Sequence, residues 1–456
     1  MEQEKFISNK DLALYTPQRS MLTTAGHIEA DMHEQETTFD LYIRELPKNR
    51  NYLIFAGLED VVHYLMNLRF IEEDIELIQK QFNFPEKIIN YFRNFKFTGT
   101  VYAMKEGTIF FPNEPIIRIT GPLAQLQIIE SFLFNTVGFQ TLMASKISRL
   151  VHAAKPYAVG IGESRAHGLE AGLKAIRSGY IAGTNSSPLL LSFKRYGIPA
   201  IGGIATHFFV TSFPTEIEAF RAYLNVDPNG SVMVDTYNFE EGIKNAIKVA
   251  RELEQKGKKM KWITIDSGDL YERYVLARKM LDEAGLDYIE LTAVSNLDEH
   301  KIKELVEKGA TYNLFGAATE IVTSSDCPKI EIVYKLAEIN QDGKWKPTAK
   351  FAPGKISYPG RKQIYRIKEG DYYKFDVVGL EKEEIEGEPL LQKIIVNGEF
   401  IGETPQLEQI KKYTAEQYGK FHPSLFNVSK FVEYGVNISQ GVMQIVNELK
   451  KEYNVK

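Results

Sequence analysis

Polar side chains follow several β-rich segments in the middle of the chain, where strands are expected to end. In parallel α/β architectures the carboxyl ends of the strands share one edge, so these side chains are expected to gather there. They are Arg165 and His167 after 157–162, Thr184, Asn185 and Ser186 after 179–184, His207 after 199–205, Asp235 within 231–237, Asp266, Ser267 and Asp269 after 262–266, Ser295 and Asn296 after 289–295, and Gly316 and Thr319 at 312–318. One such residue means little, whereas a ring of them predicts an active site.

Two of these residues are aspartates that end apolar or alternating runs. Asp235 follows "VMV" and Asp266 follows "KWITI". A carboxylate at the end of a buried strand needs a cation, a metal ion or ligand hydroxyls as its partner. Together the two could bind Mg²⁺ or sugar hydroxyls. Asp269 precedes a helical pattern, and its simpler interpretation is a helix N-cap.

The segment "GIATHFF" raises two interpretations of His207. Among small residues and next to two phenylalanines, the ring fits a buried structural histidine. At a strand end among carboxylates, it fits a nucleophile or general base, because its pKa is near neutrality. No pair of histidines has the spacing of zinc ligands, so a zinc site is not expected.

Two further strand ends carry small polar residues. Ser295 and Asn296 stand just before a probable helix that starts near Asp298, and "FGAATEI" contains Gly316 and Thr319. Exposed amides at a helix start can hold an anion, although helix capping explains each turn equally well. On successive strand ends, the two turns fit a phosphate site of the kind that barrels build from their last strands.

The elements that must position these residues alternate between strands and helices. Seven β-rich segments lie between 157 and 318, and helical patterns at 238–257 and 269–285 separate some of them. Alternation at this spacing predicts a parallel sheet, and seven units favour a barrel over an open sheet. The expected fold class is therefore α/β, with an irregular TIM-like barrel.

The flanks of the chain have a different pattern and no core of their own. Strands and helices mix in the N-terminal flank, and strands and turns dominate much of the C-terminal flank. We expect the flanks to pack together as an α+β domain. The predicted division is an N-terminal domain at 1–140, a catalytic barrel at 141–340 and a C-terminal segment at 341–456, with 341–350 as a boundary loop.

Composition excludes several classes of protein. The chain has 456 residues and a net charge of -5, so it lacks a general basic field for nucleic acid. Its single cysteine excludes an intrachain disulfide and fits a reducing cytoplasm. No apolar stretch approaches the roughly 20 residues of a membrane span, and no signal peptide is evident. A cytoplasmic protein that binds neither membrane nor nucleic acid is expected.

Several blocks follow one another in a distinctive order. They are "TFDLYIRELPKNRNYLIFAGLEDVVHYLMNLRFIEEDI" (38–75), "ESRAHGLEAGLKAIRSGYIAGTNSS" (163–187), "GIATHFFVTSFPTEIEAFRAY" (203–223), "VMVDTYN" (232–238), "IDSGDL" (265–270), "SNLDE" (295–299) and the segment 333–366 with "APGKISYPGRKQIYR". In this order the chain resembles the nicotinate phosphoribosyltransferase family over nearly its whole length. The resemblance implies an irregular α/β barrel, an α+β domain made by both flanks, and a homodimer with shared active sites.

The resemblance also implies a reaction and roles for residues. The family joins nicotinate to phosphoribosyl pyrophosphate with Mg²⁺, in NAD salvage, and ATP drives the reaction through a transient phosphohistidine. By motif, His207 would be the phosphorylated residue, Arg165 would contact the phosphoribosyl donor, and Asp235 and Asp266 would bind ribose hydroxyls or Mg²⁺. The expected 5′-phosphate site and the remaining substrate contact comprise Ser295, Asn296, Gly316, Thr319 and Thr184.

Some positions depart from the family pattern. Arg19 stands where the family has a tyrosine that stacks on the base, and Ser164 replaces the first of two arginines. Ile204 replaces a threonine, and "GAAT" replaces the glycine-rich phosphate turn. Thr264 stands where the family has an arginine, and threonine can neither pair with a carboxylate nor stack on a pyridine ring. Arg19 and Thr264 are therefore expected in the base pocket.

These departures leave three hypotheses. The first is a nicotinate phosphoribosyltransferase. The second is a paralogue with a rebuilt base pocket that accepts another heterocycle such as nicotinamide. The third is a catalytically silent homologue that acts as a binding protein. Thr264 favours the second and third, whereas the retained His207, Asp235 and Asp266 argue against the third.

Overall fold

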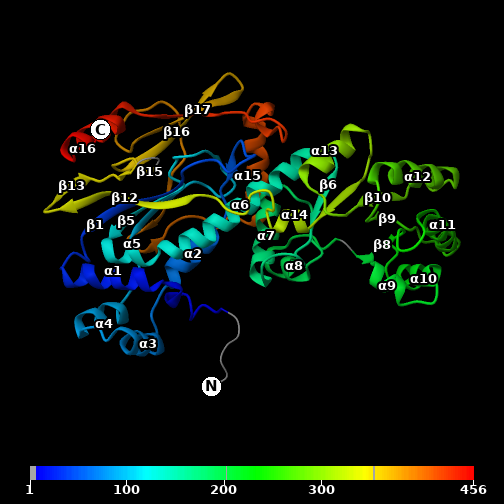
Figure 1. Cartoon of the computed structure of the whole chain (residues 1–456), viewed down its shortest axis with the longest axis horizontal. Helices are drawn as coiled ribbons and strands as arrows, with labels where there is room; N and C mark the ends of the chain where they lie inside the picture. Colours follow the sequence, from blue (N-terminus) through cyan, green and yellow to red (C-terminus); the bar gives the residue numbers. More distant parts are fainter. Residues whose placement is uncertain (1–6, 202, 353–354, 456) are drawn as a thin grey trace. The chain divides into compact units, whose positions relative to one another are not determined.

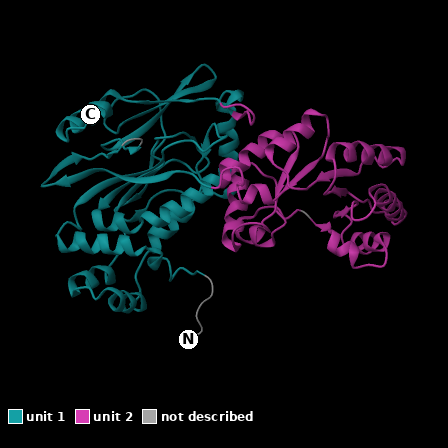
Figure 2. Cartoon of the chain, in the orientation of Figure 1, with its two compact units in different colours: residues 1–142, 329–425, 432–456 teal, residues 143–328, 426–431 magenta. Residues whose placement is uncertain are grey.

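A six-stranded parallel sheet organises the middle of the chain, in the order β6-β11-β10-β9-β8-β7 (Figure 1). The computed structural model describes residues 7–201, 203–352 and 355–455. The strands of this sheet are β6 (Ala158–Ile161), β7 (Ile204–Ala205), β8 (Ser231–Met233), β9 (Trp262–Ile265), β10 (Glu290–Ala293) and β11 (Leu314–Ala317). The sheet belongs to unit 2, which comprises 143–328 and 426–431, while 1–142, 329–425 and 432–456 form unit 1 (Figure 2).

Two isolated parallel bridges continue the pairing beyond β6. Gly160 of β6 pairs with Ser186, and Ser187 pairs with Ala200 in the segment before β7. The parallel sheet with these bridges forms a half-barrel, which agrees with the α/β class expected from the sequence.

Helices connect the strands of unit 2. They are α6 (Glu130–Ala154, which crosses the boundary between the units), α7 (Leu169–Ala182), α8 (Leu190–Tyr196), α9 (His207–Thr211), α10 (Glu216–Val226), α11 (Phe239–Gln255), α12 (Leu270–Glu283), α13 (Glu299–Glu307) and α14 (Thr319–Val322). Side-chain caps start four of them: Thr215 accepts from Glu218 N and Asn238 from Glu241 N, while Asp269 and Asp298 each accept from two backbone N–H groups of α12 and α13. The predicted helices at 238–257 and 269–285 and the N-cap role of Asp269 are confirmed.

One predicted strand is wrong. Residues 179–182 of the expected strand 179–184 form the last turn of α7. Gly183 follows with φ 118°, and its N–H caps the helix by binding the carbonyl groups of Gly179 and Tyr180. A short apolar run does not distinguish a buried helix from a strand, and nearly every residue of α7 from 172 onward is buried. Thr184 therefore follows a helix rather than a strand.

Unit 1 contains most of the two flanks of the chain. Its main sheets have the orders β13-β12-β1-β5-β3-β19-β20 and β18-β16-β17-β21. The strands are β1 (Glu36–Ile43), β2 (Leu53–Ile54), β3 (Thr100–Ala103), β4 (Ile109–Phe110), β5 (Ile117–Pro122), β12 (Ile332–Gln341), β13 (Lys344–Pro347), β14 (Phe351–Ala352), β15 (Lys355–Ile356), β16 (Lys362–Glu369), β17 (Tyr372–Leu380), β18 (Glu388–Pro389), β19 (Gln392–Val396), β20 (Glu399–Phe400) and β21 (Gly435–Ile438). The helices are α1 (Gln18–Glu29), α2 (Leu58–Asn67), α3 (Glu72–Phe82), α4 (Glu86–Arg93), α5 (Leu123–Ile128), α15 (Leu407–Lys420) and α16 (Gln440–Glu452), with short 3-10 turns at Ala13–Tyr15 and Pro423–Phe426.

The segment 341–350, expected as a boundary loop, forms part of a hairpin inside unit 1. Gln341 of β12 pairs with Lys344 of β13 across the two-residue turn Asp342-Gly343. Both turn residues have positive φ, 52° and 78°, which is the conformation that a tight hairpin turn requires. The structure divides the chain at 328/329, before β12 begins. Within the described ranges, no helix is both long and apolar enough to cross a membrane.

Candidate active site

The parallel register brings His207, Asp235 and Asp266 to one edge of the sheet. Their strands β7, β8 and β9 are neighbours, and Met233 at the end of β8 pairs with Thr264 near the end of β9. Asp235 is the second residue after β8, Asp266 is the first residue after β9, and His207 is the first residue of α9, just after β7. The predicted clustering of these three side chains at the carboxyl ends is therefore what the structure contains.

The side chain of Asp235 is fully buried, and its two carboxylate oxygens differ in their hydrogen bonds. Its Oδ2 accepts hydrogen bonds from the backbone N–H of Asp266 at 2.9 Å, Ser267 Oγ at 2.6 Å and Arg273 Nη1 at 3.1 Å. Its Oδ1 is buried and has no hydrogen-bond partner among the described residues. A buried carboxylate oxygen is stable only with a partner, so Oδ1 is a candidate ligand atom for a hydroxyl or a cation.

The imidazole of His207 lies between a hydroxyl and the two carboxylates. Its Nδ1 is 2.9 Å from Thr236 Oγ1, and its Nε2 is 3.4 Å from Asp266 Oδ2 and 4.0 Å from Asp235 Oδ1. The side chain is 39% exposed, so a ligand can reach the ring. This position favours the nucleophile or base interpretation over that of a buried structural histidine.

The two carboxylates affect each other electrostatically. Partial burial raises the pKa of Asp266, the charge of Asp235 raises it further, and His207 opposes both effects. A cluster that retains a proton more readily than an isolated aspartate suits a site that exchanges a proton or a cation when ligand binds.

The two predicted anion turns have different structures. Ser295 and Asn296 follow β10 with positive φ, 99° and 45°, and Lys301 Nζ donates to the carbonyl of Asn296 at 2.9 Å. Gly316 lies within β11, where an added Cβ would be 2.8 Å from Val294 Cγ1, so close strand packing already explains this glycine. Thr319 is the first residue of the short helix α14.

The other predicted site residues belong to other elements of the chain. Arg165 is exposed in the loop after β6, and Thr184 is buried just after α7. Thr264 is fully buried in β9, where its hydroxyl is 2.6 Å from Ser231 Oγ. Arg19 belongs to α1 in unit 1, where it forms an ion pair with Glu130 at 3.1 Å.

Two residues of the cluster were missed from the sequence. Thr236 contacts His207, and Arg273 contacts both Asp235 and Ser267. A signal for Arg273 existed: it lies four residues after the N-cap Asp269, on the first turn of α12, from which a long side chain can reach back to the strand end.

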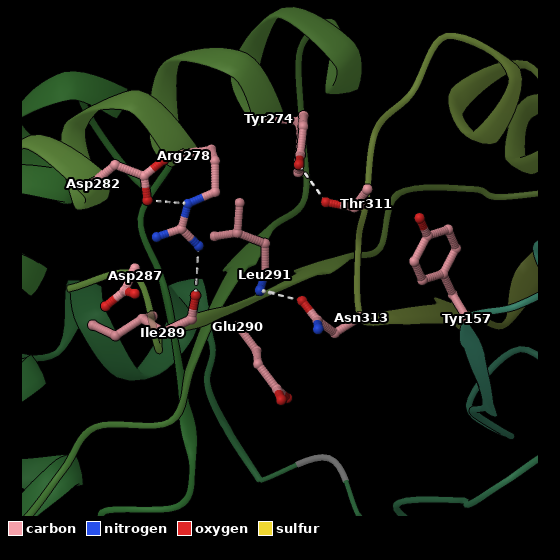
Figure 3. Close-up of a pocket in the computed structure, with 10 residues that line it drawn as sticks. All are labelled: Tyr157, Tyr274, Arg278, Asp282, Asp287, Ile289, Glu290, Leu291, Thr311 and Asn313. Carbon is pink, nitrogen blue, oxygen red and sulfur yellow. Dashed lines mark hydrogen bonds and ion pairs between the residues drawn. The ribbon is translucent and has the colours of Figure 1, made fainter. Parts of the chain in front are cut away.

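A pocket of about 360 Å³ opens at the opposite, amino-terminal end of the sheet (Figure 3). Its polar groups largely bind one another. Arg278 donates to Asp282 at 2.7 Å and to the carbonyl of Ile289 at 2.8 Å, while Asn313 Oδ1 accepts from Leu291 N at 3.2 Å (Figure 3). In barrels this end serves stability, so the carboxyl-end cluster is the stronger candidate for catalysis.

An irregular α/β barrel with an accessible histidine and two carboxylates at the carboxyl ends of its strands, in a chain that also has an α+β unit, is typical of a barrel enzyme. Residues 19–138 match the nicotinate phosphoribosyltransferase (NAPRTase) N-terminal domain, and residues 384–446 match the nicotinate phosphoribosyltransferase C-terminal domain. The nicotinate phosphoribosyltransferase pncB2 of Mycobacterium tuberculosis is 34% identical, covering 94% of this chain and 92% of its own length. The Bacillus subtilis nicotinate phosphoribosyltransferase is 33% identical over 96% of both chains.

Solved structures agree on the fold. Human nicotinic acid phosphoribosyltransferase superposes with a TM-score of 0.86 at 23% identity, covering 95% of this chain and 99% of its own. The nicotinate-nucleotide pyrophosphorylase of Pyrococcus furiosus gives a TM-score of 0.73 at 24% identity, covering 92% of this chain and 99% of its own. The chain belongs to the nicotinate phosphoribosyltransferase family, and so to the phosphoribosyltransferase enzymes.

Proposed function

We propose that the protein transfers the phosphoribosyl group of phosphoribosyl pyrophosphate to nicotinate, which yields nicotinate mononucleotide and diphosphate. The observation that carries this proposal is the cluster of His207, Asp235 and Asp266 at the carboxyl ends of three adjacent strands. Relatives that cover more than nine-tenths of the chain are named for this activity, which supports the same substrates and a role in NAD salvage.

The transfer needs stabilisation of charge more than proton transfer. The lone pair of the pyridine nitrogen forms the bond to C1 of the ribose, and the C1–O bond to diphosphate breaks with its electron pair on the leaving group. The ribose acquires oxocarbenium character on the way, and nearby carboxylates stabilise this positive charge. Asp235 Oδ1 and Asp266 are suited to this role and to binding the ribose hydroxyls, because the first is buried without a partner and the second is only half-buried.

Magnesium fits the same two carboxylates. The unpartnered Oδ1 of Asp235 and the carboxylate of Asp266 are the hard oxygen donors that Mg²⁺ prefers, and Mg²⁺ commonly binds one or two carboxylates together with substrate phosphates. When bound, the ion would offset the charge of the diphosphate. Arg165 is exposed at the carboxyl end of β6 and would contact the donor, and the turns at Ser295, Asn296 and Thr319 would hold its 5′-phosphate.

We propose that ATP coupling passes through His207. When Nδ1–H donates to Thr236 Oγ1, Nε2 carries the free lone pair and can attack the γ-phosphorus of ATP. The bond from that phosphorus to the bridging oxygen breaks, ADP leaves, and the phosphoryl group remains on Nε2 until water removes it. Radiolabelled γ-phosphate is expected to appear as an acid-labile adduct in the wild type and to be absent from His207→Ala. Unchanged labelling and unchanged ATP stimulation in that variant exclude this role.

We further propose a homodimer. Several large apolar side chains are exposed around the carboxyl-end loops of unit 2, which is unfavourable for a free surface and typical of an interface. Phe208, next to His207, is 85% exposed, and Leu190 and Phe193 of α8 are 73% and 58% exposed. Sedimentation equilibrium is expected to give twice the mass of the chain, whereas a monomer at micromolar concentration contradicts the proposal.

A screen of bases tests the proposed reaction. Purified protein, Mg²⁺ and phosphoribosyl pyrophosphate are incubated with nicotinate, nicotinamide or quinolinate, with and without ATP, and products are identified by mass spectrometry. Nicotinate mononucleotide is expected as the main product, with a higher yield when ATP is present. A product with nicotinamide alone supports a rebuilt base pocket, and no product with any base supports a silent homologue.

A further inference from the structure

The nearest cation to the buried carboxylate of Asp235 comes from a helix. Arg273 lies on the first turns of α12, and its Nη1 is 3.1 Å from Asp235 Oδ2 and 2.9 Å from Ser267 Oγ. Thr264, which lies in β9 two residues before Asp266, carries no charge. Its buried hydroxyl binds Ser231 Oγ. The guanidinium therefore reaches the strand ends from α12.

Two packing contacts hold the guanidinium in this position. It lies over the ring of Phe239 at the start of α11, with its central carbon 4.7 Å from the ring centroid. It also crosses the turn at Gly268, where φ is 72° and an added Cβ would be 2.3 Å from Arg273 Nε. Glycine at 268 thus serves both the turn and the approach of the arginine.

The two carboxylate oxygens of Asp235 have different hydrogen bonds, because Arg273 binds only one of them. Oδ2 accepts from three donors, of which Arg273 is the charged one, while Oδ1 has no partner among the described residues and is 4.0 Å from His207 Nε2. Rotation of the carboxylate would break the bonds to Oδ2, including a charge-assisted one. Arg273 therefore keeps Oδ1 on the side of His207.

We propose that Arg273 is a positioning residue, which holds Asp235 so that Oδ1 is presented to the phosphoribosyl donor and its metal ion. The inference rests on the proposed function in one respect: the donor must bind at Asp235. Arg273 itself touches no reacting atom and acts through Asp235 and Ser267. The Lys variant can restore the charge but not the planar contact over Phe239, because an ammonium group lacks the flat face of guanidinium.

Partial rescue by lysine separates positioning from simple support of the fold. The charge at residue 273 acts on Asp235 Oδ2 at 3.1 Å, so a side chain that keeps this charge is expected to retain part of kcat/KM. A neutral side chain that only fills the same volume is expected to retain none of this effect.

Arg273→Met and Arg273→Lys test the proposal, and Arg221→Met is the matched control. Arg221 forms a two-pronged ion pair with Glu252 between α10 and α11 and does not contact Asp235. Arg273→Met is expected to lower kcat/KM for phosphoribosyl pyrophosphate by about 10- to 100-fold, the effect of one lost hydrogen bond to a charged group. Arg273→Lys is expected to recover part of the loss, and the circular dichroism spectra of all three variants should match the wild type.

The outcomes distinguish this inference from the proposed function. If the wild type makes nicotinate mononucleotide and Arg273→Met keeps wild-type kcat/KM, the positioning role is wrong and the proposed function stands. If the wild type makes no product, the proposed function fails, and calorimetry with Mg²⁺ and phosphoribosyl pyrophosphate decides the inference. Binding that is at least tenfold weaker in Arg273→Met, with Arg221→Met unchanged, supports positioning, and equal binding in Arg273→Met overturns it.

Discussion

The Nδ1 atom of His207 lies 2.9 Å from Thr236 Oγ1, and this contact determines which nitrogen of the ring faces the carboxylates. With Nδ1 engaged, Nε2 is directed to Asp266 and Asp235. Histidines that act in catalysis commonly have one nitrogen oriented by a neighbour while the other reacts. Thr236 thus has a role that its place after a strand end does not by itself reveal.

Thr236→Val tests this orientation. Valine has the shape of threonine but cannot bind Nδ1, so the ring loses the hydrogen bond that fixes its orientation. A neutral hydrogen bond of this kind is worth about 1 kcal/mol, so the ATP-stimulated rate is expected to fall by about fivefold. Thr236→Ser, which keeps the hydroxyl, should stay near the wild-type rate. Equal rates for the Val and Ser variants would show that the hydroxyl is unimportant.

Asp266 and Asp269 are three residues apart, and their carboxyl groups should affect stability in opposite directions. Burial and Asp235 raise the pKa of Asp266, so the folded state binds its proton more tightly than the unfolded state does. Ionisation of Asp266, which occurs as the pH rises through its raised pKa, therefore lowers the free energy of unfolding. Asp266→Asn is expected to increase the melting temperature at pH 7 and to leave it unchanged well below pH 4, while activity falls sharply.

Asp269 is the matched comparison. Its carboxylate accepts from the N–H groups of Glu272 and Tyr271, which lowers its pKa. A lowered pKa gives stability that is present above the unfolded pKa and is lost as the pH falls through the folded value. Asp269→Ala is therefore expected to melt lower than wild type at pH 7, with a smaller gap in acid. Differential scanning calorimetry across this pH range should find opposite signs, and equal signs for the two variants would contradict the assignment.

Thr264 is expected to matter for stability more than for base recognition. Its hydroxyl is fully buried and bonded to Ser231 Oγ at 2.6 Å. Thr264→Val leaves the Ser231 hydroxyl without a partner, at a cost of about 1–2 kcal/mol in the free energy of unfolding. Adding Ser231→Ala should recover part of this cost, and the ratio of kcat/KM for nicotinate and nicotinamide should stay within about twofold. A changed ratio would place Thr264 in the base pocket after all.

A buried ion cluster anchors the helix that follows the Ser295-Asn296 turn. Lys146 Nζ is 2.7 Å from Glu299 Oε2, Arg149 Nε is 2.7 Å from Glu299 Oε1, and the side chains are at most 5% exposed. Lys146→Met breaks this cluster, and removal of one member of a buried ion pair typically costs about 3–5 kcal/mol. Denaturant unfolding should detect the loss. Lys308→Met, which breaks the exposed pair with Glu304, should leave stability nearly unchanged.

Local patterns in the sequence were sufficient for some of these features. The alternating run that ends at Asp266 and the capping position of Asp269 depend on a few neighbouring residues, and both appear in the structure. The run 179–184 was misassigned, because its apolar residues belong to the buried face of α7. Burial of a helix by tertiary packing is not visible in a short window.

Contacts between different helices and strands could not be predicted from the sequence. Arg273 reaches Asp235 only because α12 packs with a particular phase next to β8 and β9, and Thr264 meets Ser231 only through the register of those two strands. The resemblance to the family motif suggested a base-pocket position for Thr264, whereas its side chain is buried and bonded to Ser231. Strand order and helix phase determine such contacts, and a single sequence contains no direct measure of either.

The most direct test of the cluster as the catalytic centre is the rate of nicotinate mononucleotide formation by wild type and Asp235→Asn, measured by mass spectrometry with saturating Mg²⁺, ATP and phosphoribosyl pyrophosphate. Asparagine keeps the size of the side chain but removes its charge, so the account predicts steady product formation by wild type and a rate at least about 100-fold lower for the variant. Both proteins should give superimposable circular dichroism spectra. Equal rates in the two proteins, or no nicotinate mononucleotide from the wild type, would contradict the central claim.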